Sequence, residues 1–237
     1  GHNFALQAQE NGASAILAQK NIEGITIPML IIDDTQHHIA DVAGLFYDYP
    51  SRKLNLIGVT GTNGKTTVTH LIERIFEYNN EACGLIGTLG YKLSTKSEYK
   101  DAKHTTPQAP ELQSTLHIMK ENNLKNVVME VSSHSLSQNR VGTCEFNCAI
   151  LTNLTQDHLD YHITMQNYFK AKALLFSSLK PGSISIINND DMRAKAFIEA
   201  CTEGTKVYTY GIEKEADVKA FDIDFTTAGA AFSCKTP

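Results

Sequence analysis

The fold class follows from one stretch of the sequence, residues 57–67, which read IGVTGTNGKTT. Apolar residues predict a strand that ends at Thr60, a glycine-rich turn follows it, and Lys65 and Thr66 open a helix. Glycines let the backbone of such a turn curl until its N–H groups point at phosphate oxygens, and the helix N-terminus adds about half a positive charge there. The stretch therefore predicts a phosphate-binding loop in an α/β domain.

In this interpretation Lys65 reaches the β- and γ-phosphates of a nucleotide, and the hydroxyl of Thr66 binds Mg²⁺. The strict spacing of such loops, G-x-x-x-x-G-K-[ST], requires glycine at the position of Val59, whereas this loop has its glycines at Gly61 and Gly64. A glycine-rich turn with a chance lysine is the alternative. The strand before the loop and the helix after it favour nucleotide binding, but the loop alone does not separate a hydrolase, a kinase and a ligase.

Composition narrows the class of protein. The 237 residues correspond to one or two domains of about 150 residues each. The net charge is −5, whereas nucleic-acid binders usually carry a basic surplus. No apolar run approaches the about 18–20 residues that cross a bilayer. The five cysteines are odd in number and scattered, which favours reduced thiols in the cytoplasm over a disulfide framework. We therefore predict a cytoplasmic protein without membrane insertion and without a nucleic-acid partner.

From residue 54 onward, strand patterns alternate with helix patterns, which predicts βαβ units and a mainly parallel sheet. Several strands are continuously apolar, as expected when both faces of a sheet are covered. The predicted strands are Leu54–Thr60, Gly84–Gly87, Asn126–Val131, Cys148–Leu154, Ser183–Asn188 and Lys206–Tyr210. The predicted helices are Lys65–Tyr78, Ala109–Asn122, Met165–Ser177 and Asp191–Cys201.

Residues 1–53 have the pattern of part of a smaller α/β unit. Apolar residues at helical spacing run from Phe4 to Ile16, and residues 29–32 form a short apolar run that predicts a buried strand. A second helix is predicted over residues 35–47. The polar segment 49–53 contains proline and is the best domain boundary, so we predict domains at 1–53 and 54–237.

Glu130 ends the apolar strand pattern of residues 126–131 and precedes a polar cluster, Ser132-Ser133-His134. In open α/β sheets, ligands bind beyond the carboxyl ends of the strands. We therefore expect Glu130 to meet the metal ion held by Thr66. A solvent-exposed glutamate at a strand end is the alternative.

A second polar segment, residues 153–162, reads NLTQDHLDYH and concentrates two carboxylates and two imidazoles. His158 and His162 are spaced i, i+4, which can place both rings on one helical face as in zinc sites. The pair lacks the glutamate of H-E-x-x-H, and the nearby Cys144 and Cys148 fit core packing. A histidine that helps to hold Mg²⁺ at a phosphate site is the favoured interpretation.

Lys172 lies between apolar neighbours on the predicted helix 165–177. Spacing alone favours a side chain that runs along the apolar surface and reaches solvent with its amine.

Together these segments resemble the Mur ligases, ATP-dependent amide-bond-forming enzymes of peptidoglycan precursor synthesis, and among them the MurE type. Five ordered motifs make chance agreement very small, and HTTP and MEVSSH favour MurE over the other types. The motifs are residues 59–67 (VTGTNGKTT), 104–107 (HTTP), 129–136 (MEVSSHSL) with Gln138 and Arg140, 152–162 (TNLTQDHLDYH) and the helix of Lys172. The resemblance implies a P-loop central domain with a mainly parallel sheet, preceded by the end of the small domain that binds UDP-MurNAc.

The resemblance also implies a reaction. The family member of this type joins an amino acid, meso-diaminopimelate or L-lysine, to UDP-MurNAc-L-Ala-D-Glu. The substrate carboxylate attacks the γ-phosphate of ATP to give an acyl phosphate, which the incoming amine then opens. Phosphoryl transfer to a carboxylate brings two anions together, so Mg²⁺ ions and Lys65 must screen the charge.

By similarity, residue roles follow. Lys65, His158 and Lys172 would be catalytic. Thr66 and Glu130 would hold one Mg²⁺, and His158 would hold a second together with Lys172, which the family carbamylates. A carbamate is an anionic oxygen ligand of the kind that Mg²⁺ prefers, so this role replaces the solvent-exposed interpretation of Lys172. The expected ATP-binding residues are Gly61, Thr62, Asn63, Gly64, Lys65, Thr66, Thr67 and Asn153. The expected residues for UDP-MurNAc-L-Ala-D-Glu are Thr105, Thr106, Ser132, Gln138 and Arg140.

The sequence departs from the family pattern in two respects. His104 stands where many relatives have asparagine, so it is left out of the predicted site. The alternating run 231–234 predicts a final strand, and the third domain of the family, which selects the incoming amino acid, does not follow it. We therefore expect a fragment that is nearly inactive in amide formation by itself. We also expect the protein to be a monomer.

Three alternatives stay open at this point. Folylpolyglutamate synthase shares the ATP domain but would lack residues 1–53 and the segment 129–136. A P-loop ATPase or switch that binds a protein partner would need neither His158 nor Lys172. A non-catalytic binding remnant is the third alternative, and the intact Lys65, Glu130 and Lys172 argue mildly against it.

Overall fold

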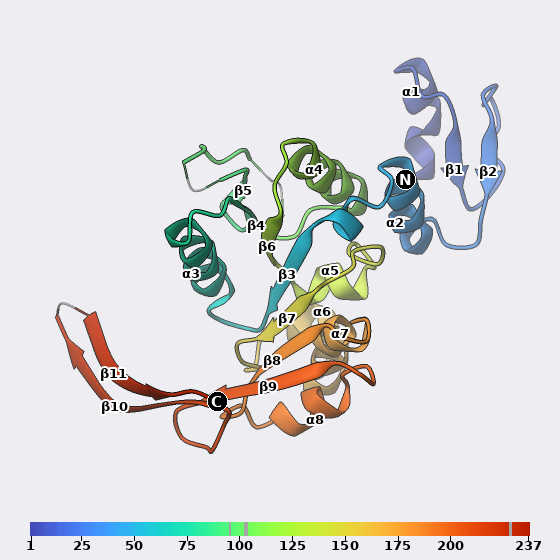
Figure 1. Ribbon diagram of the computed structural model, residues 1–237. Helices are drawn as coiled ribbons and strands as arrows, with labels where there is room; N and C mark the ends of the chain where they lie inside the picture. The colour runs from blue at the N-terminus through green and yellow to red at the C-terminus, as the bar shows by residue number, and fades with distance from the viewer. Residues whose placement is uncertain (95, 102–103, 228) are drawn as a thin grey trace.

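The computed structural model describes residues 1–94, 96–101, 104–227 and 229–237. The chain forms two sheets, a two-stranded parallel sheet near the N-terminus and a nine-stranded sheet that begins at residue 55 (Figure 1). The small N-terminal unit projects from one side of the larger body, and a long hairpin near the C-terminus projects from another (Figure 1). Within the described residues, no helix has the length and apolar character needed to cross a membrane.

The small unit differs from its sequence prediction in two places. The helix predicted from Phe4 to Ile16 ends early, because Gly12 takes a φ of +89° and breaks the helical path. Ile16 lies instead in a strand that pairs in parallel with the next one. That second strand forms where predicted, but it is not buried, since Leu30 is 61% exposed at the edge of a sheet of two strands. The elements are a 3₁₀ turn at His2–Phe4, α1 (Ala5–Glu10), β1 (Ile16–Ala18), β2 (Met29–Ile31) and α2 (Thr35–Phe46).

The predicted mainly parallel sheet is confirmed. Seven neighbouring strands run parallel, and an antiparallel strand closes each edge. The short strand β5 and the largely exposed strand β10 were not predicted, because neither carries a buried apolar run. In spatial order the strands are β11 (Gly229–Lys235), β10 (Val218–Thr226), β9 (Lys206–Gly211), β8 (Ile184–Asn188), β7 (Cys148–Leu151), β3 (Asn55–Thr60), β6 (Asn126–Glu130), β4 (Cys83–Gly87) and β5 (Gly90–Lys92).

The helices of the larger unit include two whose predicted bounds are those observed, α3 (Lys65–Tyr78) and α7 (Met165–Ser177). The helix predicted over Asp191–Cys201 is shorter, because the side chain of Asp191 accepts the N–H of Arg193 at 2.8 Å and forms a turn before the helix begins. The remaining elements are a 3₁₀ turn at Pro50–Lys53, α4 (Ala109–Glu121), α5 (Ser133–Ser137), α6 (Leu159–His162) and α8 (Ala194–Glu199).

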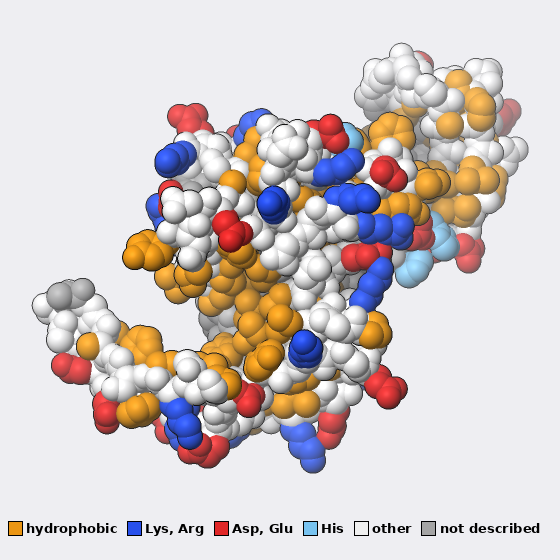
Figure 2. Space-filling view, viewed as in Figure 1, with side chains coloured by type: hydrophobic (Ala, Val, Ile, Leu, Met, Phe, Trp, Pro, Cys, Tyr) orange, Lys and Arg blue, Asp and Glu red, His pale blue; other side chains and the backbone are white. Residues whose placement is uncertain are grey.

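The two faces of the sheet carry separate apolar cores. Along β3, Leu56 faces a core shared with α4, α7 and α8, whereas Ile57 faces a core shared with α3. The central strands therefore bury the side chains on both faces of the sheet, which explains their continuous apolar sequence. The face on the side of α3 is only partly covered, since Ile184 on β8 and Tyr208 on β9 are 37% and 42% exposed. Figure 2 shows hydrophobic side chains at the surface on this side of the molecule.

Candidate functional site

The loop between β3 and α3 curls at two glycines. Gly61 has a φ of +151°, and a Cβ there would overlap the hydroxyl oxygen of Thr152. Gly64 has a φ of +84°, a left-handed conformation that costs glycine nothing. Asn153, which follows β7, binds this loop three times: its carbonyl accepts the N–H of Thr62 at 2.9 Å, its side-chain oxygen accepts the N–H of Asn63 at 3.0 Å, and its amide donates to the carbonyl of Asn63 at 3.1 Å.

The first turn of α3 meets the end of β6 next to this loop. The hydroxyl of Thr66 lies 3.0 Å from both carboxylate oxygens of Glu130. Glu130 is only 1% exposed. The structure thus brings together the two residues expected to hold a metal ion. A third residue completes the contact: Thr88, just after β4, donates its N–H and its hydroxyl to the same carboxylate at 2.9 and 3.1 Å.

Two lysines lie beside the loop, and both donate to its carbonyl groups. The amine of Lys65 lies 2.9 Å from the carbonyls of Gly61 and of Thr62. The amine of Lys172 donates to the Gly61 carbonyl at 2.8 Å and lies 4.6 Å from the ring centre of Tyr168. Lys172 is 1% exposed, so the solvent-exposed path that spacing favoured for its side chain is wrong. The chain packs it inward from α7.

The surroundings make both amines poorer bases. Burial lowers the pKa of Lys65, and the carboxylates of Glu130 and Asp157 act in the opposite direction. Burial and then repulsion from Lys65 lower the pKa of Lys172 to about 7, with Asp157 again opposing. No ion pair engages either lysine within the part of the chain that the structure describes. An anion placed against the loop would therefore meet the cation of Lys65, which no carboxylate engages in an ion pair within these described residues.

The two histidines of residues 153–162 both pack against the ring of His134, with ring centres 4.8 Å away for His158 and 5.5 Å away for His162. His158 precedes α6 with a left-handed φ of +50° and is paired with Asp157 at 3.4 Å. His162 is buried, and its ring bonds the hydroxyl of Ser133 at 2.9 Å. Burial lowers the pKa of His162, and the nearby ring of His134 adds to the effect. The described residues contain no group of three or more His, Cys, Asp or Glu arranged to hold a metal, and no hydrogen bond links His158 to Glu130.

The residues expected at the acceptor substrate gather around the ends of β6 and α5. The hydroxyl of Thr106 donates to the carbonyl of Glu130 at 2.8 Å and accepts the N–H of Ser132 at 3.0 Å. Arg140 donates to the carbonyl of Thr106 at 3.0 Å and to the side chain of Gln138 at 2.9 Å. These four residues form one hydrogen-bonded cluster directly beside Glu130.

Thr105 approaches Glu130 by another route, because its hydroxyl lies 3.2 Å from that of Thr88. The Thr88 hydroxyl has one hydrogen, which the Glu130 carboxylate must receive, so Thr105 donates to Thr88. Thr67, the last residue of the predicted nucleotide loop, is exposed on the first turn of α3. Thr88 was not predicted from the sequence, although its position directly after the buried strand β4 indicates the same edge of the sheet.

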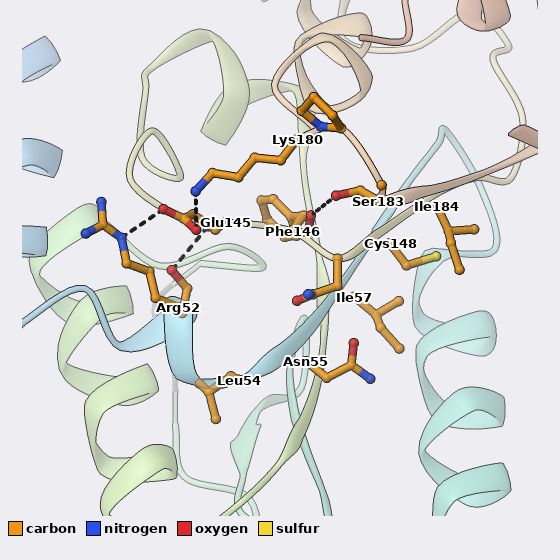
Figure 3. A pocket seen from close by; sticks show the side chains of 14 residues that line it. Arg52, Leu54, Asn55, Ile57, Glu145, Phe146, Cys148, Lys180, Ser183 and Ile184 are labelled. Carbon is orange, nitrogen blue, oxygen red and sulfur yellow. Dashed lines mark hydrogen bonds and ion pairs between the residues drawn. The ribbon is translucent and has the colours of Figure 1, made fainter. Parts of the chain in front are cut away.

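A large cavity of about 650 Å³ lies at the opposite end of the sheet, where β3, β7 and β8 begin (Figure 3). Arg52 and Lys180 point toward Glu145 at its rim, with nitrogen–oxygen distances of 2.8 and 2.5 Å (Figure 3). Because ligands of open α/β sheets bind at the carboxyl ends of the strands, the candidate functional site is the loop with its lysines and not this cavity.

Comparison with known proteins identifies the family. A family model described as the Mur ligase middle domain matches residues 59–237. The UDP-N-acetylmuramoyl-L-alanyl-D-glutamate--2,6-diaminopimelate ligase of Oceanobacillus iheyensis is 43% identical over 244 residues, which cover 100% of this chain and 49% of that protein. A solved structure with the same enzyme name matches with a TM-score of 0.85 and 32% identity, over 99% of this chain and 48% of the other.

A folylpolyglutamate synthase of Mycobacterium tuberculosis, complexed with ADP and AMPPCP, matches with a TM-score of 0.65 and 12% identity over 82% of this chain and 50% of the other. At that identity the likeness concerns the fold alone. The chain spans about half the length of the curated relatives that it matches. On the family model and on identity over its whole length, the chain belongs to the Mur ligase family.

Proposed function

We propose that this chain binds ATP at residues 61–67 and that the full-length protein uses it to join 2,6-diaminopimelate to UDP-MurNAc-L-Ala-D-Glu. One observation carries the proposal: the amine of Lys65 lies against the carbonyls of Gly61 and Thr62 and has no carboxylate in an ion pair with it within the described residues. Buried cations are normally paired, so an arrangement like this favours a multiply charged anionic ligand. The names of the relatives at 43% and 44% identity support the substrate assignment.

The donor set beside the loop fits Mg²⁺. Thr66 supplies a hydroxyl and Glu130 a buried carboxylate, both hard oxygen ligands, and they already lie in contact. The ion would screen the phosphate charge and link the phosphate oxygens to the protein. For a second ion we propose His158 and Lys172 as ligands, with Lys172 as its carbamate.

The chemistry of Lys172 supports that modification. An amine attacks CO₂ only in its neutral form, and burial lowers the pKa of Lys172 to about 7, so a substantial neutral fraction exists near neutral pH. The ammonium group first loses one proton; the neutral amine then attacks the carbon of CO₂, one C–O π bond opens as the N–C bond forms, and a second proton leaves the nitrogen. The two proton losses together convert a cation into an anion. That change would remove the repulsion between Lys172 and Lys65.

The residues of this chain then have distinct tasks. Lys65 would stabilise the negative charge that develops on the transferred phosphoryl group. During this step the acceptor carboxylate attacks phosphorus and ADP leaves. The Thr106–Arg140 cluster would hold the acceptor next to Glu130, and Arg140 adds a cation for its carboxylate. The amine of the incoming amino acid attacks the acyl carbon, and phosphate leaves as the amide forms.

Cellular location and oligomeric state belong to the same proposal. The five cysteines are free, as thiols are in a reducing cytoplasm, and we infer a cytoplasmic monomer. We also propose that residues 1–53 complete the end of a UDP-MurNAc-binding domain and that residues 54–237 belong to the ATP-binding domain. The two separate sheets support a boundary near Lys53.

The test uses the purified full-length protein with Mg²⁺, ATP and 2,6-diaminopimelate, and it measures ADP release and the amide product. We expect ADP release that requires UDP-MurNAc-L-Ala-D-Glu. ADP release that needs no acceptor would favour a P-loop ATPase, and product from tetrahydrofolate and glutamate would favour the folylpolyglutamate synthase alternative. L-Lysine in place of 2,6-diaminopimelate tests the choice of amine.

A further inference from the structure

A strap of chain crosses the side of α3. It lies between the nucleotide loop and the cluster proposed to hold the acceptor substrate, which consists of Thr106, Ser132, Gln138 and Arg140. We define the strap as residues 88–94 and 96–101. It begins at Thr88, forms β5, and returns so that Tyr91 and Lys100 exchange backbone hydrogen bonds of 3.0 and 2.8 Å. In Figure 1, β5 lies beside α3, on the edge of the sheet.

Two side-chain contacts fix the strap to successive turns of α3. The amine of Lys92 lies 2.9 Å from the carboxylate of Glu73, and these side chains are 7% and 1% exposed. One turn earlier on α3, the ring of His70 bonds the hydroxyl of Tyr99 at 2.6 Å. His70 and Glu73 are spaced i, i+3, so they lie on the same face of the helix.

The hydrogens of the His70 contact have one consistent arrangement for a neutral ring. Nδ1 of His70 lies 2.7 Å from the carbonyl of Thr66, and a carbonyl only accepts, so Nδ1 carries the hydrogen. Nε2 then accepts the hydroxyl hydrogen of Tyr99. A directed chain of two hydrogen bonds therefore runs from the strap to the carbonyl of Thr66, whose side chain meets Glu130.

The other end of the strap meets the opposite side of the same carboxylate. Thr88 donates to Glu130 and accepts from Thr105, which belongs to the residues proposed for the acceptor. The strap is thus held at one end by the first turns of α3 and at the other by Glu130.

We propose that His70 and Tyr99 are positioning residues, which hold the strap so that Thr88 and Thr105 face the acceptor at the correct distance from Thr66. The inference rests on the proposed function, because it assigns the pair an effect on the acceptor substrate. Neither side chain needs to touch a substrate. Loss of the Tyr99 hydroxyl leaves the bond between His70 and Thr66 intact, so the nucleotide loop keeps its support while the strap loses one contact.

The experiment measures the KM values of the full-length protein for ATP and for UDP-MurNAc-L-Ala-D-Glu. For Tyr99→Phe we expect the acceptor KM to rise about three- to tenfold, as for loss of one hydrogen bond, with the ATP KM and kcat unchanged within about twofold. Tyr91→Phe is the matched control, because in the described part of the strap its hydroxyl has no hydrogen-bond partner.

A second variant tests whether the two residues act through one bond. In His70→Asn, the side-chain amide can still donate to Thr66 but is too short to reach Tyr99. We expect it to match Tyr99→Phe, and the double variant to be no worse than either single one. Unchanged acceptor KM in Tyr99→Phe, or effects that multiply in the double variant, would overturn the proposal.

Hydrogen–deuterium exchange separates this inference from the proposed function. In Tyr99→Phe we expect faster exchange in residues 88–94 and 96–101 and unchanged exchange in α4. If the wild-type protein forms no amide from UDP-MurNAc-L-Ala-D-Glu, the proposed function fails, while the exchange result still tests whether Tyr99 holds the strap. If amide forms normally but neither KM nor exchange changes in the variant, the positioning role alone fails.

Discussion

Positive charge gathers at both ends of the central strands, and the two ends differ in what neutralises it. At the amino end, Arg52 and Lys180 share the carboxylate of Glu145, and more than half of each basic side chain is exposed. At the carboxyl end, Lys65 and Lys172 donate to backbone carbonyls, and Lys172 is almost wholly buried.

The comparison teaches that unneutralised charge, and not cavity size, marks the ligand end of this sheet. The cavity of about 650 Å³ belongs to the amino end, where every basic side chain at the rim already has its carboxylate. Paired surface charges are stable in water without a ligand. A buried amine without a carboxylate is costly, so the carboxyl end gains most when an anion binds.

The largest effect on the difference between the two ends of the sheet is expected at Lys65. Lys65→Ala in the full-length protein should lower ATP turnover by about 10³-fold or more, because one preorganised cation at the transferred phosphate is removed. A coupled ADP-release assay measures it. Lys180→Ala at the amino end is the matched control and should stay within about twofold of the wild-type protein. Normal turnover in Lys65→Ala would remove the phosphate-loop assignment.

Substitution of Lys172 is a second test, and small carboxylic acids should partly rescue the variant. Lys172→Ala should lose about 10²–10³-fold in amide formation, since the proposed anionic ligand is missing. Acetate or formate at high concentration should restore part of the rate by occupying the space of the carbamate. Lys170→Ala, on the exposed side of the same helix, should behave like the wild-type protein. Full activity of Lys172→Ala would contradict the two-metal proposal.

The pH dependence of unfolding tests how Lys172 is buried. Its pKa is about 7 in the folded chain and near its ordinary value when unfolded, so the unfolded state binds more protons between these pH values. Stability should therefore rise with pH, by about 2–3 kcal/mol between about pH 7 and pH 9, and the rise should be absent in Lys172→Met. Urea unfolding in CO₂-free buffer measures the difference. Equal slopes for both proteins would contradict a buried, unpaired amine.

The sequence was informative where a single segment carries its own signal. α3 and α7 have the predicted bounds because helical spacing and capping are local, as with Thr164, whose hydroxyl accepts the N–H of Asn167 at 3.1 Å. Strands β10 and β5 were missed because their stability comes from pairing with neighbours and not from buried apolar residues. The exposed strand β2 shows the same limit, since only the fold decides which strand lies at an edge.

The candidate site divides in the same way. The contact between Thr66 and Glu130 could be predicted, because strand ends share one edge of the sheet. The inward path of Lys172 could not, because spacing on a helix does not say which apolar neighbours cover the amine. His158 shows a further limit: its spacing from His162 does not reveal that His158 precedes α6 with a left-handed φ, nor that both rings pack against His134.

Thr88 tests a neutral residue at the carboxyl end of the sheet, because it donates hydrogen bonds to the charged carboxylate of Glu130. Thr88→Val keeps the shape but loses a hydroxyl that joins Thr105 to Glu130, so amide formation should fall about tenfold. Thr88→Ser retains the hydroxyl and should keep most of the rate. Steady-state kinetics at saturating ATP measure both variants. A Ser variant as poor as the Val variant would assign the effect to packing of the methyl group.

The smallest effect is expected at the amino end. Hydrogen bonds from Lys180 and Arg52 lower the pKa of Glu145, so its contribution to stability is present at neutral pH and is lost as pH falls through its folded pKa. Because the pair is partly exposed, Glu145→Gln should cost only about 0.5–1 kcal/mol in urea unfolding, and less at high salt. ATP turnover of the full-length variant should not change. A large loss of turnover would mean that the paired charges of the amino end also serve the ligand, and the distinction between the two ends would no longer hold.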